Sequence, residues 1–275
     1  MVPMVLTLPL FLIQSETPTR RYSYILASLM TLVICLSTGS KATAAQNTVA
    51  QVTTAQNTAA KSQGLQAQLA SAMRERMRAC TACHGKEGVA TNQGYFPRIA
   101  GKPADYLYNQ LRNFREGRRQ NSAMRHLLEH MSDDYLRQMA RYFSELDLPY
   151  PAPQPTSAPP ALLARGEQLV MQGDRQAEFP ACTACHGAAM TGRLPSTPGL
   201  LGLPKDYVVA QLGAWRAGTR KAEAPDCMAQ VARRLSREDI HAVSQWLAAQ
   251  PVPERGHPAA PGRQTTGIRC KDDPK

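Results

Sequence analysis

The hexapeptide C-T-A-C-H-G occurs twice in the sequence, at 80–85 and at 182–187. In each copy two thiols lie three residues apart, and a histidine directly follows the second. Thiols at this spacing form thioethers with the two vinyl groups of one haem, and the adjacent imidazole then ligates the iron. Zinc half-sites and redox dithiols also use C-x-x-C, but neither requires the histidine. The sequence therefore predicts two covalently bound haem c groups. The predicted haem-binding residues are Cys80, Cys83, His84, Cys182, Cys185 and His186.

A longer stretch of sequence that follows each haem motif is also repeated. Residues 101–117 align with residues 202–218 at a constant offset of 101 residues. One structural unit is therefore used twice, as a first module (65–148) and a second module (161–250), joined by a proline-rich linker (149–160). A tail (251–275) follows the second module.

Methionines at equivalent places in the two modules are the candidate sixth ligands of the irons. Met124 and Met228 each lie seven residues before the pair of residues that opens the last helix of their module. A thioether ligand favours ferrous iron and raises the reduction potential. Methionine more often fills a core, and Met131 competes nearby, but its counterpart Leu235 cannot ligate iron. We predict that Met124 and Met228 complete the ligation and that both lie in irregular segments.

Two further pairs of residues leave alternatives open. His126 and His130 are rival ligands for the first iron, although the second module offers no equivalent. Cys227, beside the proposed ligand, and Cys270, in the tail, make an even pair. In an oxidising compartment they would form a disulfide that ties the tail over the second haem. Two separate thiols are the alternative.

Each module is predicted to contain three helices that hold these residues. The first covers about 65–82 in the first module, and 161–184 with a loop at 173–180 in the second. The next carries an apolar stripe at positions i, i+4 and i+7, and ends at Gly117 or Gly218. The last helix of each module begins at Ser132 or at Ser236. Asp239 lies at the third helical position after Ser236, which resembles a capping box with aspartate in place of glutamate. Burial of a haem would supply the core that such short helices lack.

The N-terminus is typical of an exported protein. Arg20 and Arg21 precede an apolar stretch, and Ala42-Thr43-Ala44 follows it, which is the order of a secretory signal. We expect a signal at 1–44 that is cleaved after Ala44 or Ala45, and hence a periplasmic protein. An uncleaved signal that attaches the protein to the membrane is the alternative. Residues 45–64 have almost no large apolar side chains and are predicted to form a flexible tether.

The net charge of +11 is spread thinly along the 275 residues. There is no long Lys/Arg block and no interleaved aromatic platform, so nucleic acid is not expected as a partner. Basic residues around exposed haem edges are instead expected to steer an acidic redox protein. These are Arg118, Arg119, Arg125, Arg220 and Lys221.

Taken together, these motifs resemble the class I cytochromes c, and specifically the two-domain dihaem cytochrome c4 family. The likeness covers about residues 65–250 and includes Phe96-Pro97-Arg98-Ile99-Ala100-Gly101 as well as the haem motifs. The resemblance implies an all-α fold of two tandem cytochrome c domains with His/Met ligation. It also implies that the carbonyls of Pro97 and Pro198 accept a hydrogen bond from the proximal histidines. The tether, the linker and the cysteine-bearing tail depart from the family pattern.

The resemblance further implies a periplasmic carrier of single electrons, without substrate chemistry, that delivers them toward a terminal oxidase. The expected partners are redox proteins: a terminal oxidase, a quinol-oxidising complex or a dehydrogenase. Two alternatives remain. A dihaem peroxidase would need an iron with an open distal position, and the chain could also be the cytochrome subunit of a periplasmic dehydrogenase complex.

Overall fold

The computed structural model describes residues 39–90, 95–254, 256–262, 266–268 and 270–271, with side chains from residue 56 onward. The chain divides into two units, residues 1–63 and residues 64–275. Most of the predicted signal sequence lies outside the described residues. None of the helices in the described part is both long and apolar enough to cross a membrane.

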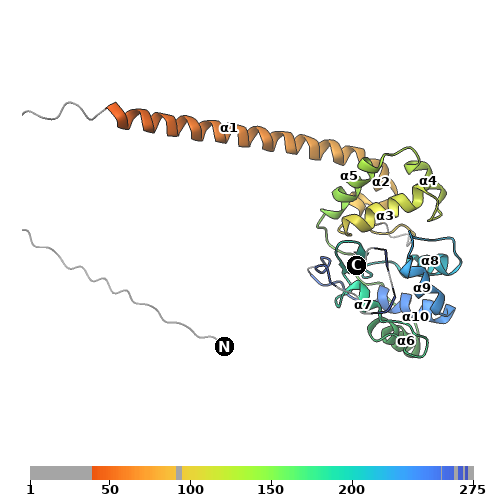
Figure 1. The fold of residues 1–275 in the computed structure, drawn as a ribbon. Helices are drawn as coiled ribbons and strands as arrows, with labels where there is room; N and C mark the ends of the chain where they lie inside the picture. The colour runs from red at the N-terminus through yellow and green to blue at the C-terminus, as the bar shows by residue number, and fades with distance from the viewer. Residues whose placement is uncertain (1–38, 91–94, 255, 263–265, 269, 272–275) are drawn as a thin grey trace, which may run out of the picture. The chain divides into compact units, whose positions relative to one another are not determined.

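Helix α1 (Gly39–Arg76) includes the last residues of the first unit and the first residues of the second (Figure 1). We predicted a flexible tether at residues 45–64, whereas the structure has these residues in helix α1. Alanine and glutamine have high helix propensity, and residues 45–63 contain no glycine or proline that would interrupt a helix. As expected, the side chains of residues 56–64 are exposed and belong to no core.

Besides the three predicted helices, the described part of the first module has two short ones. Its elements are α2 (Arg78–His84), the 3-10 helix η1 (Lys86–Gly88), α3 (Ala104–Arg115), α4 (Ser122–Leu128) and α5 (Asp133–Ser144). The helix expected at 65–82 corresponds to the end of α1 and to α2, which are divided at the buried Met77. Helix α5 begins at the predicted cap, where the Ser132 side chain accepts a hydrogen bond from the Tyr135 N–H.

The second module repeats this order. Its helices are α6 (Pro160–Met171), α7 (Cys182–His186), α8 (Lys205–Arg216), α9 (Cys227–Arg234) and α10 (Arg237–Ala248). Ser236 and Asp239 form the full capping box at the start of α10. The short antiparallel strands β1 (Gly192–Arg193) and β2 (Thr197–Pro198), which the sequence did not predict, lie between α7 and α8.

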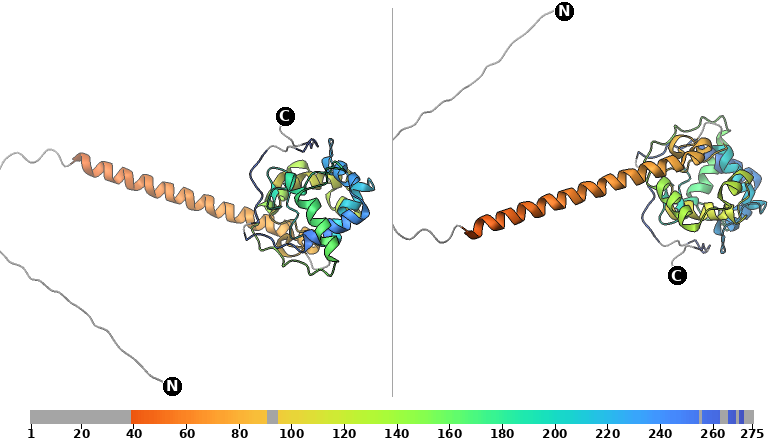
Figure 2. Two further views of the ribbon diagram at one scale, coloured as in Figure 1. Left: turned by 90° about the horizontal axis from the view of Figure 1, so that it is seen from below. Right: turned by 90° about the horizontal axis from the view of Figure 1, so that it is seen from above.

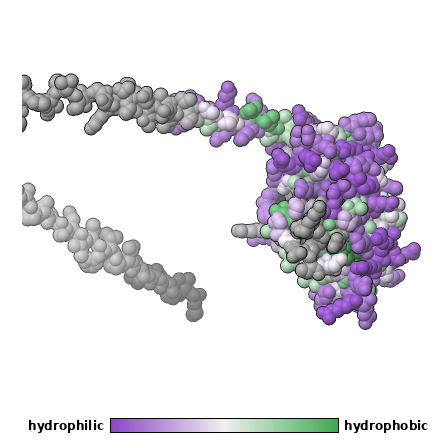
Figure 3. Space-filling model, in the orientation of Figure 1, coloured by the Kyte–Doolittle hydropathy of each residue, from purple (hydrophilic) through white to green (hydrophobic). Residues whose placement is uncertain are grey.

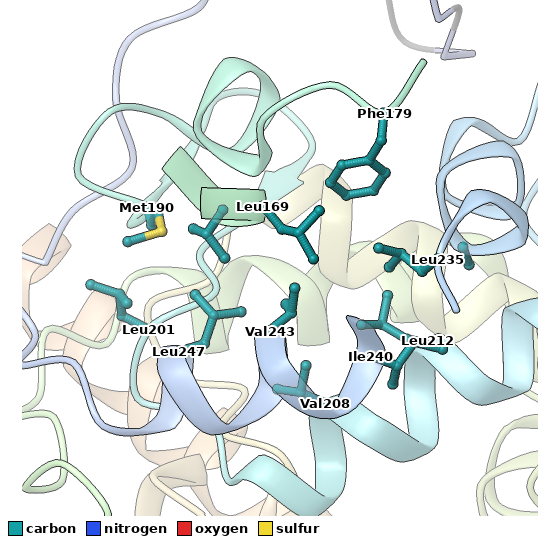
Figure 4. Packing of buried hydrophobic residues seen from close by; sticks show 12 residues of the cluster. Leu169, Phe179, Met190, Leu201, Val208, Leu212, Leu235, Ile240, Val243 and Leu247 are labelled. Carbon is teal, nitrogen blue, oxygen red and sulfur yellow. The ribbon is translucent and has the colours of Figure 1, made fainter. Parts of the chain in front are cut away.

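Each module has its own apolar core. In the second module the core side chains come mainly from α6, α8 and α10, and Figure 4 shows Leu169, Val208, Leu212, Val243 and Leu247 among them. In the first module, Leu107 and Phe114 of α3 pack with Leu136 and Phe143 of α5, on the faces that the apolar spacing predicted. The helices of both modules belong to the second unit, residues 64–275 (Figure 2). The face of this unit that is seen in Figure 3 is predominantly hydrophilic.

Candidate haem-binding site

Each haem motif lies on a short helix that ends at its histidine. In α2, Cys80 and Cys83 are three residues apart and therefore lie on the same helical face, as do Cys182 and Cys185 in α7. After His84 the chain leaves the helix through Gly85, which has a φ of 78°. A Cβ atom there would lie 2.3 Å from the carbonyl oxygen of Ala90, so only glycine fits this turn.

The two proximal histidines are held in the same way. The Nδ1 atom of His84 lies 2.9 Å from the carbonyl oxygen of Pro97, and the Nδ1 atom of His186 lies 2.7 Å from that of Pro198. A carbonyl can only accept, so Nδ1 must carry the proton and Nε2 presents a lone pair. These are the two hydrogen bonds that the resemblance implied.

Burial favours the neutral form of both imidazoles. It lowers the pKa of His84, and the charge of Arg119 lowers it further. Burial also lowers the pKa of His186, with an additional contribution from the charge of Lys102. In each case the bond to the proline carbonyl opposes the shift without reversing it. A neutral imidazole with a fixed tautomer is the form that ligates a metal.

One cavity of about 470 Å³ connects the two motifs. All of the predicted site residues line it: Cys80, Cys83, His84, Met124, Cys182, Cys185, His186 and Met228. The two halves of the repeat therefore open onto a shared space, and residues of both cores line it.

Met124 and Met228 lie on helices rather than in the irregular segments that we predicted. Met124 lies in the first turn of α4, where its N–H donates to the Asn121 side chain at 3.0 Å. Met228 lies in the first turn of α9, where the Asp226 side chain accepts from the Ala229 N–H. Asn and Asp are strong N-cap residues, so each short helix begins directly after its cap. The rival Met131 also lines the cavity.

The rival histidines lie elsewhere. The side chains of His126 and His130 are 83% and 92% exposed, and both contact the carboxylate of Glu129. Within the described part of the chain, neither is among the residues that line the cavity. Both are surface histidines in this structure.

Two of the arginines that we expected at exposed haem edges are buried between the modules. Arg119 and Arg220 are 8% and 4% exposed, and their backbones pair across the modules. Both guanidinium groups donate to the side-chain oxygens of Gln110 and Gln211, at 2.6–3.0 Å. Arg119 also donates to the hydroxyl oxygen of Tyr207 at 3.0 Å. Of the other three expected basic residues, Arg118 forms an ion pair with Glu116, while Arg125 and Lys221 are exposed.

This arginine pair lacks a compensating anion among the described residues, where neither guanidinium forms an ion pair with a carboxylate. Burial and the charge of Arg119 lower the pKa of Arg220 to about 10. Burial by itself raises the pKa of Tyr207, but the two arginines outweigh that effect and lower it. Burying two like charges without an anion is costly. The sequence contained a signal for this site, because Gln110 and Arg119 repeat at the same offset as Gln211 and Arg220.

The donor set of the cavity fits a haem in each module. Haem carries two carboxylates, which would compensate the charges of Arg119 and Arg220. The indole Nε1 of Trp215 is buried, lines the cavity and has no hydrogen-bond partner in the part of the chain that the structure describes, so it offers a further donor to a carboxylate. Over the described residues, no group of three or more His, Cys, Asp or Glu side chains is arranged to hold a metal ion.

The tail closes onto the second module. Cys227 and Cys270 form a disulfide with a Cα–Cα distance of 4.9 Å, which settles the alternative that the sequence left open. Ile268 is buried and lines the cavity together with Lys271. Farther up the tail, Ala259 exchanges backbone hydrogen bonds of 2.9 Å with Gly192 and Leu194 beside β1. The tail is therefore held to the second module at Ala259 and at Cys270.

Comparisons with known proteins agree with this geometry. Residues 67–143 match the family described as cytochrome c oxidase, cbb3-type, subunit III. A protein named thiosulfate dehydrogenase electron acceptor, from Thiomonas intermedia (strain K12), is 39% identical over 175 residues, which are 63% of this chain and 79% of that protein. Cytochrome c4 of Pseudomonas aeruginosa is 33% identical over 180 residues, covering 65% of this chain and 87% of the relative.

A solved structure of a cytochrome c4 is also similar to this chain. Reduced recombinant cytochrome c4 from Pseudomonas stutzeri matches with a TM-score of 0.57 and 32% identity, over 66% of this chain and 97% of that one. The predicted all-α fold of two tandem cytochrome c domains is thereby confirmed, and the two cysteine pairs fit two covalent haems. The chain belongs to the dihaem cytochrome c4 family of electron-transfer proteins.

Proposed function

We propose that this protein accepts single electrons from a dehydrogenase in the periplasm, with a thiosulfate-oxidising enzyme as the leading candidate, and passes them toward a terminal oxidase. The donor is suggested by the 39% identity to a protein named as the electron acceptor of thiosulfate dehydrogenase. The periplasm is supported by the Cys227–Cys270 disulfide, since disulfides persist in oxidising compartments. The terminal oxidase remains the acceptor that we proposed from the family resemblance.

The observation that carries the proposal is the repeated pair of buried histidines on one continuous cavity. His84 and His186 are each fixed by a proline carbonyl, and both line the same space. Haem, when bound, supplies a centre that gains and loses one electron. The chain's own contribution is to hold two such centres within one unit, shielded from water by apolar walls.

We assign Met124 and Met228 as the sixth ligands in this proposal. Their support is their equivalent place in the repeat and their place in the first turn of equivalent helices on the cavity wall. A histidine and a methionine holding each iron would leave no position for a substrate, so the protein would act as a carrier and not as an enzyme. The side chains then only orient the haems and tune their potentials.

The donor is tested by mixing the oxidised holoprotein anaerobically with catalytic amounts of a thiosulfate dehydrogenase. On addition of thiosulfate, we expect both haems to be reduced, while mixtures that lack either thiosulfate or the enzyme stay oxidised. The same oxidised protein is mixed in parallel with a quinol-oxidising complex and quinol. Rapid reduction only in the parallel mixture would reject the proposed donor and assign a respiratory complex instead.

The acceptor is tested with the reduced protein and a haem-copper terminal oxidase under air. We expect oxygen consumption that depends on the cytochrome and falls at high salt, because the docking of charged surfaces is screened by ions. Oxygen consumption that is the same with and without the cytochrome would contradict this direction of transfer.

A further inference from the structure

A buried lysine crosses from one module to the other. Lys102 directly precedes Pro103, the N-cap of α3, and is only 4% exposed. Its Nζ atom donates to the carbonyl oxygen of Gly199, in the second module, at 3.0 Å. Gly199 follows Pro198, and the Pro198 carbonyl is the acceptor for His186. Lys102 therefore holds the backbone segment that fixes the second proximal histidine.

This lysine is buried without a compensating acid among the described residues. Among the described residues, Lys102 forms no ion pair with a carboxylate, and its hydrogen bond to Gly199 is to a neutral carbonyl. Burial lowers its pKa to about 7, and the charge of Arg98 adds to the shift. The charge of Lys102 also lowers the pKa of His186, so its field reaches the second site. A buried ammonium is costly, and neither the fold nor the proposed ligation requires one here.

The repeat shows that the feature belongs to one haem site only. The residue equivalent to Lys102 is Leu203, which also lies between a glycine and a proline. Leu203 packs against the core of its own module. The Pro97 segment, which holds His84, consequently receives no such bond from the second module's equivalent position, because leucine has no donor.

We propose that Lys102 is a positioning and tuning residue that selectively raises the reduction potential of the second centre. A positive charge stabilises the more electron-rich state, so an ammonium beside the His186 segment favours the ferrous form of that iron. Its bond to Gly199 also fixes the segment that orients His186. The inference rests on the proposed function, since it takes His186 as a ligand of a redox-active haem.

The test compares Lys102→Leu, which installs the residue found in the repeat, with Lys102→Met, which keeps the length of the side chain. Both potentials are measured by optical titration, and proton NMR of the haem methyl groups assigns each potential to its centre. We expect the potential of the second centre to shift downward in both variants, while that of the first stays within error. Lys221→Gln, which removes an equal charge at an exposed position, is the matched control and should leave both potentials unchanged.

Several outcomes would overturn the inference. They are unchanged potentials in both variants, equal shifts at the two centres, or an equal shift in the Lys221→Gln control. If Lys102→Leu disturbs the fold, the test rests on the comparison of Lys102→Met with Lys102→Arg. Lys102→Arg retains the positive charge and should keep the potential of the second centre closer to the parent value. Failure of the proposed ligation would be seen separately, as a high-spin second haem in the parent protein.

Discussion

At the scale of single residues, one backbone carbonyl sets the tautomer of each of the two histidines in the haem motifs. Each Nδ1 proton is fixed by one proline carbonyl, which leaves the Nε2 lone pair of His84 and of His186 as the proposed ligand atom. The cysteines and histidines were predictable because a covalent attachment needs a fixed local spacing. Lys102 was not predictable, because its partner Gly199 lies 97 residues away and only tertiary structure brings the two together.

Replacement of either candidate methionine is expected to remove the sixth ligand from one iron. Met124→Ala and Met228→Ala should each abolish about half of the near-infrared band of ferric methionine-ligated haem, and lower one of the two potentials. Optical spectroscopy of the purified holoproteins measures both effects. Met131→Leu, at the rival position, is the matched control and should retain the whole band. Loss of the band in Met131→Leu, but not in Met124→Ala, would assign the ligand to Met131.

At the scale of secondary-structure elements, local signals predicted most helices correctly. The apolar spacing identified α3 and α8, and the serine caps identified the starts of α5 and α10. Helices α4 and α9 were missed because each has fewer than nine residues, too few for a clear period. The signals for them were the caps Asn121 and Asp226. The segment 45–64 was misjudged because its lack of a core was taken as a lack of helix.

The capping box of α10 makes a testable contribution to stability. Ser236→Ala removes the acceptor for the Asp239 N–H and is expected to lower the free energy of unfolding by about 1 kcal/mol. Denaturant titration of the second module's helical signal measures this loss. Ser236→Thr retains a capping hydroxyl and should recover most of the stability. Equal stability of Ser236→Ala and the parent would show that the box contributes nothing in this context.

Asp174 is expected to make stability depend on pH in the acid range. Hydrogen bonds from the Ala177 N–H and from Arg165 lower its pKa from the ordinary value. A carboxylate with a lowered folded-state pKa stabilises the fold above its unfolded pKa of about 3.9, and this contribution is lost as the pH falls through the folded value. Asp174→Asn should therefore be less stable than the parent at pH 7, and the difference should close at low pH.

Thermal unfolding at a series of pH values tests this expectation. The control is Glu167→Gln, which removes an exposed carboxylate from the same part of the second module. It should follow the parent at every pH. A difference between Asp174→Asn and the parent that stays the same at every pH would contradict the assignment, since it would not depend on the ionisation of Asp174.

At the scale of the whole molecule, the two modules meet through buried polar groups and the tail. The arginine pair and Lys102 bridge residues that lie far apart in the sequence, so residue patterns alone predicted exposed arginines where the structure has buried ones. The residues that meet there nevertheless occupy equivalent positions in the sequence repeat. Equivalent residues Gln110 and Gln211 accept from both arginines.

The disulfide is expected to stabilise the second module and the cover over its cavity. Replacing Cys227 and Cys270 together by alanine releases a cross-link with a sequence separation of 43 residues, which typically costs about 2–4 kcal/mol. In denaturant, the methionine band of the second haem should disappear earlier than in the parent. The first haem, whose module has no part in the cross-link, is the internal reference. Equal loss at both haems would show that the tail does not act on the second module specifically.

The most direct test of the account is a potential-controlled optical titration of the mature holoprotein, with the haem content measured in the same sample. We predict two haems per chain, both low-spin, both with the methionine-ligation band and both with positive potentials. That result is what two six-coordinate electron-transfer centres require. A high-spin haem, or one with a strongly negative potential that binds carbon monoxide or peroxide readily, would contradict the carrier and indicate an enzyme.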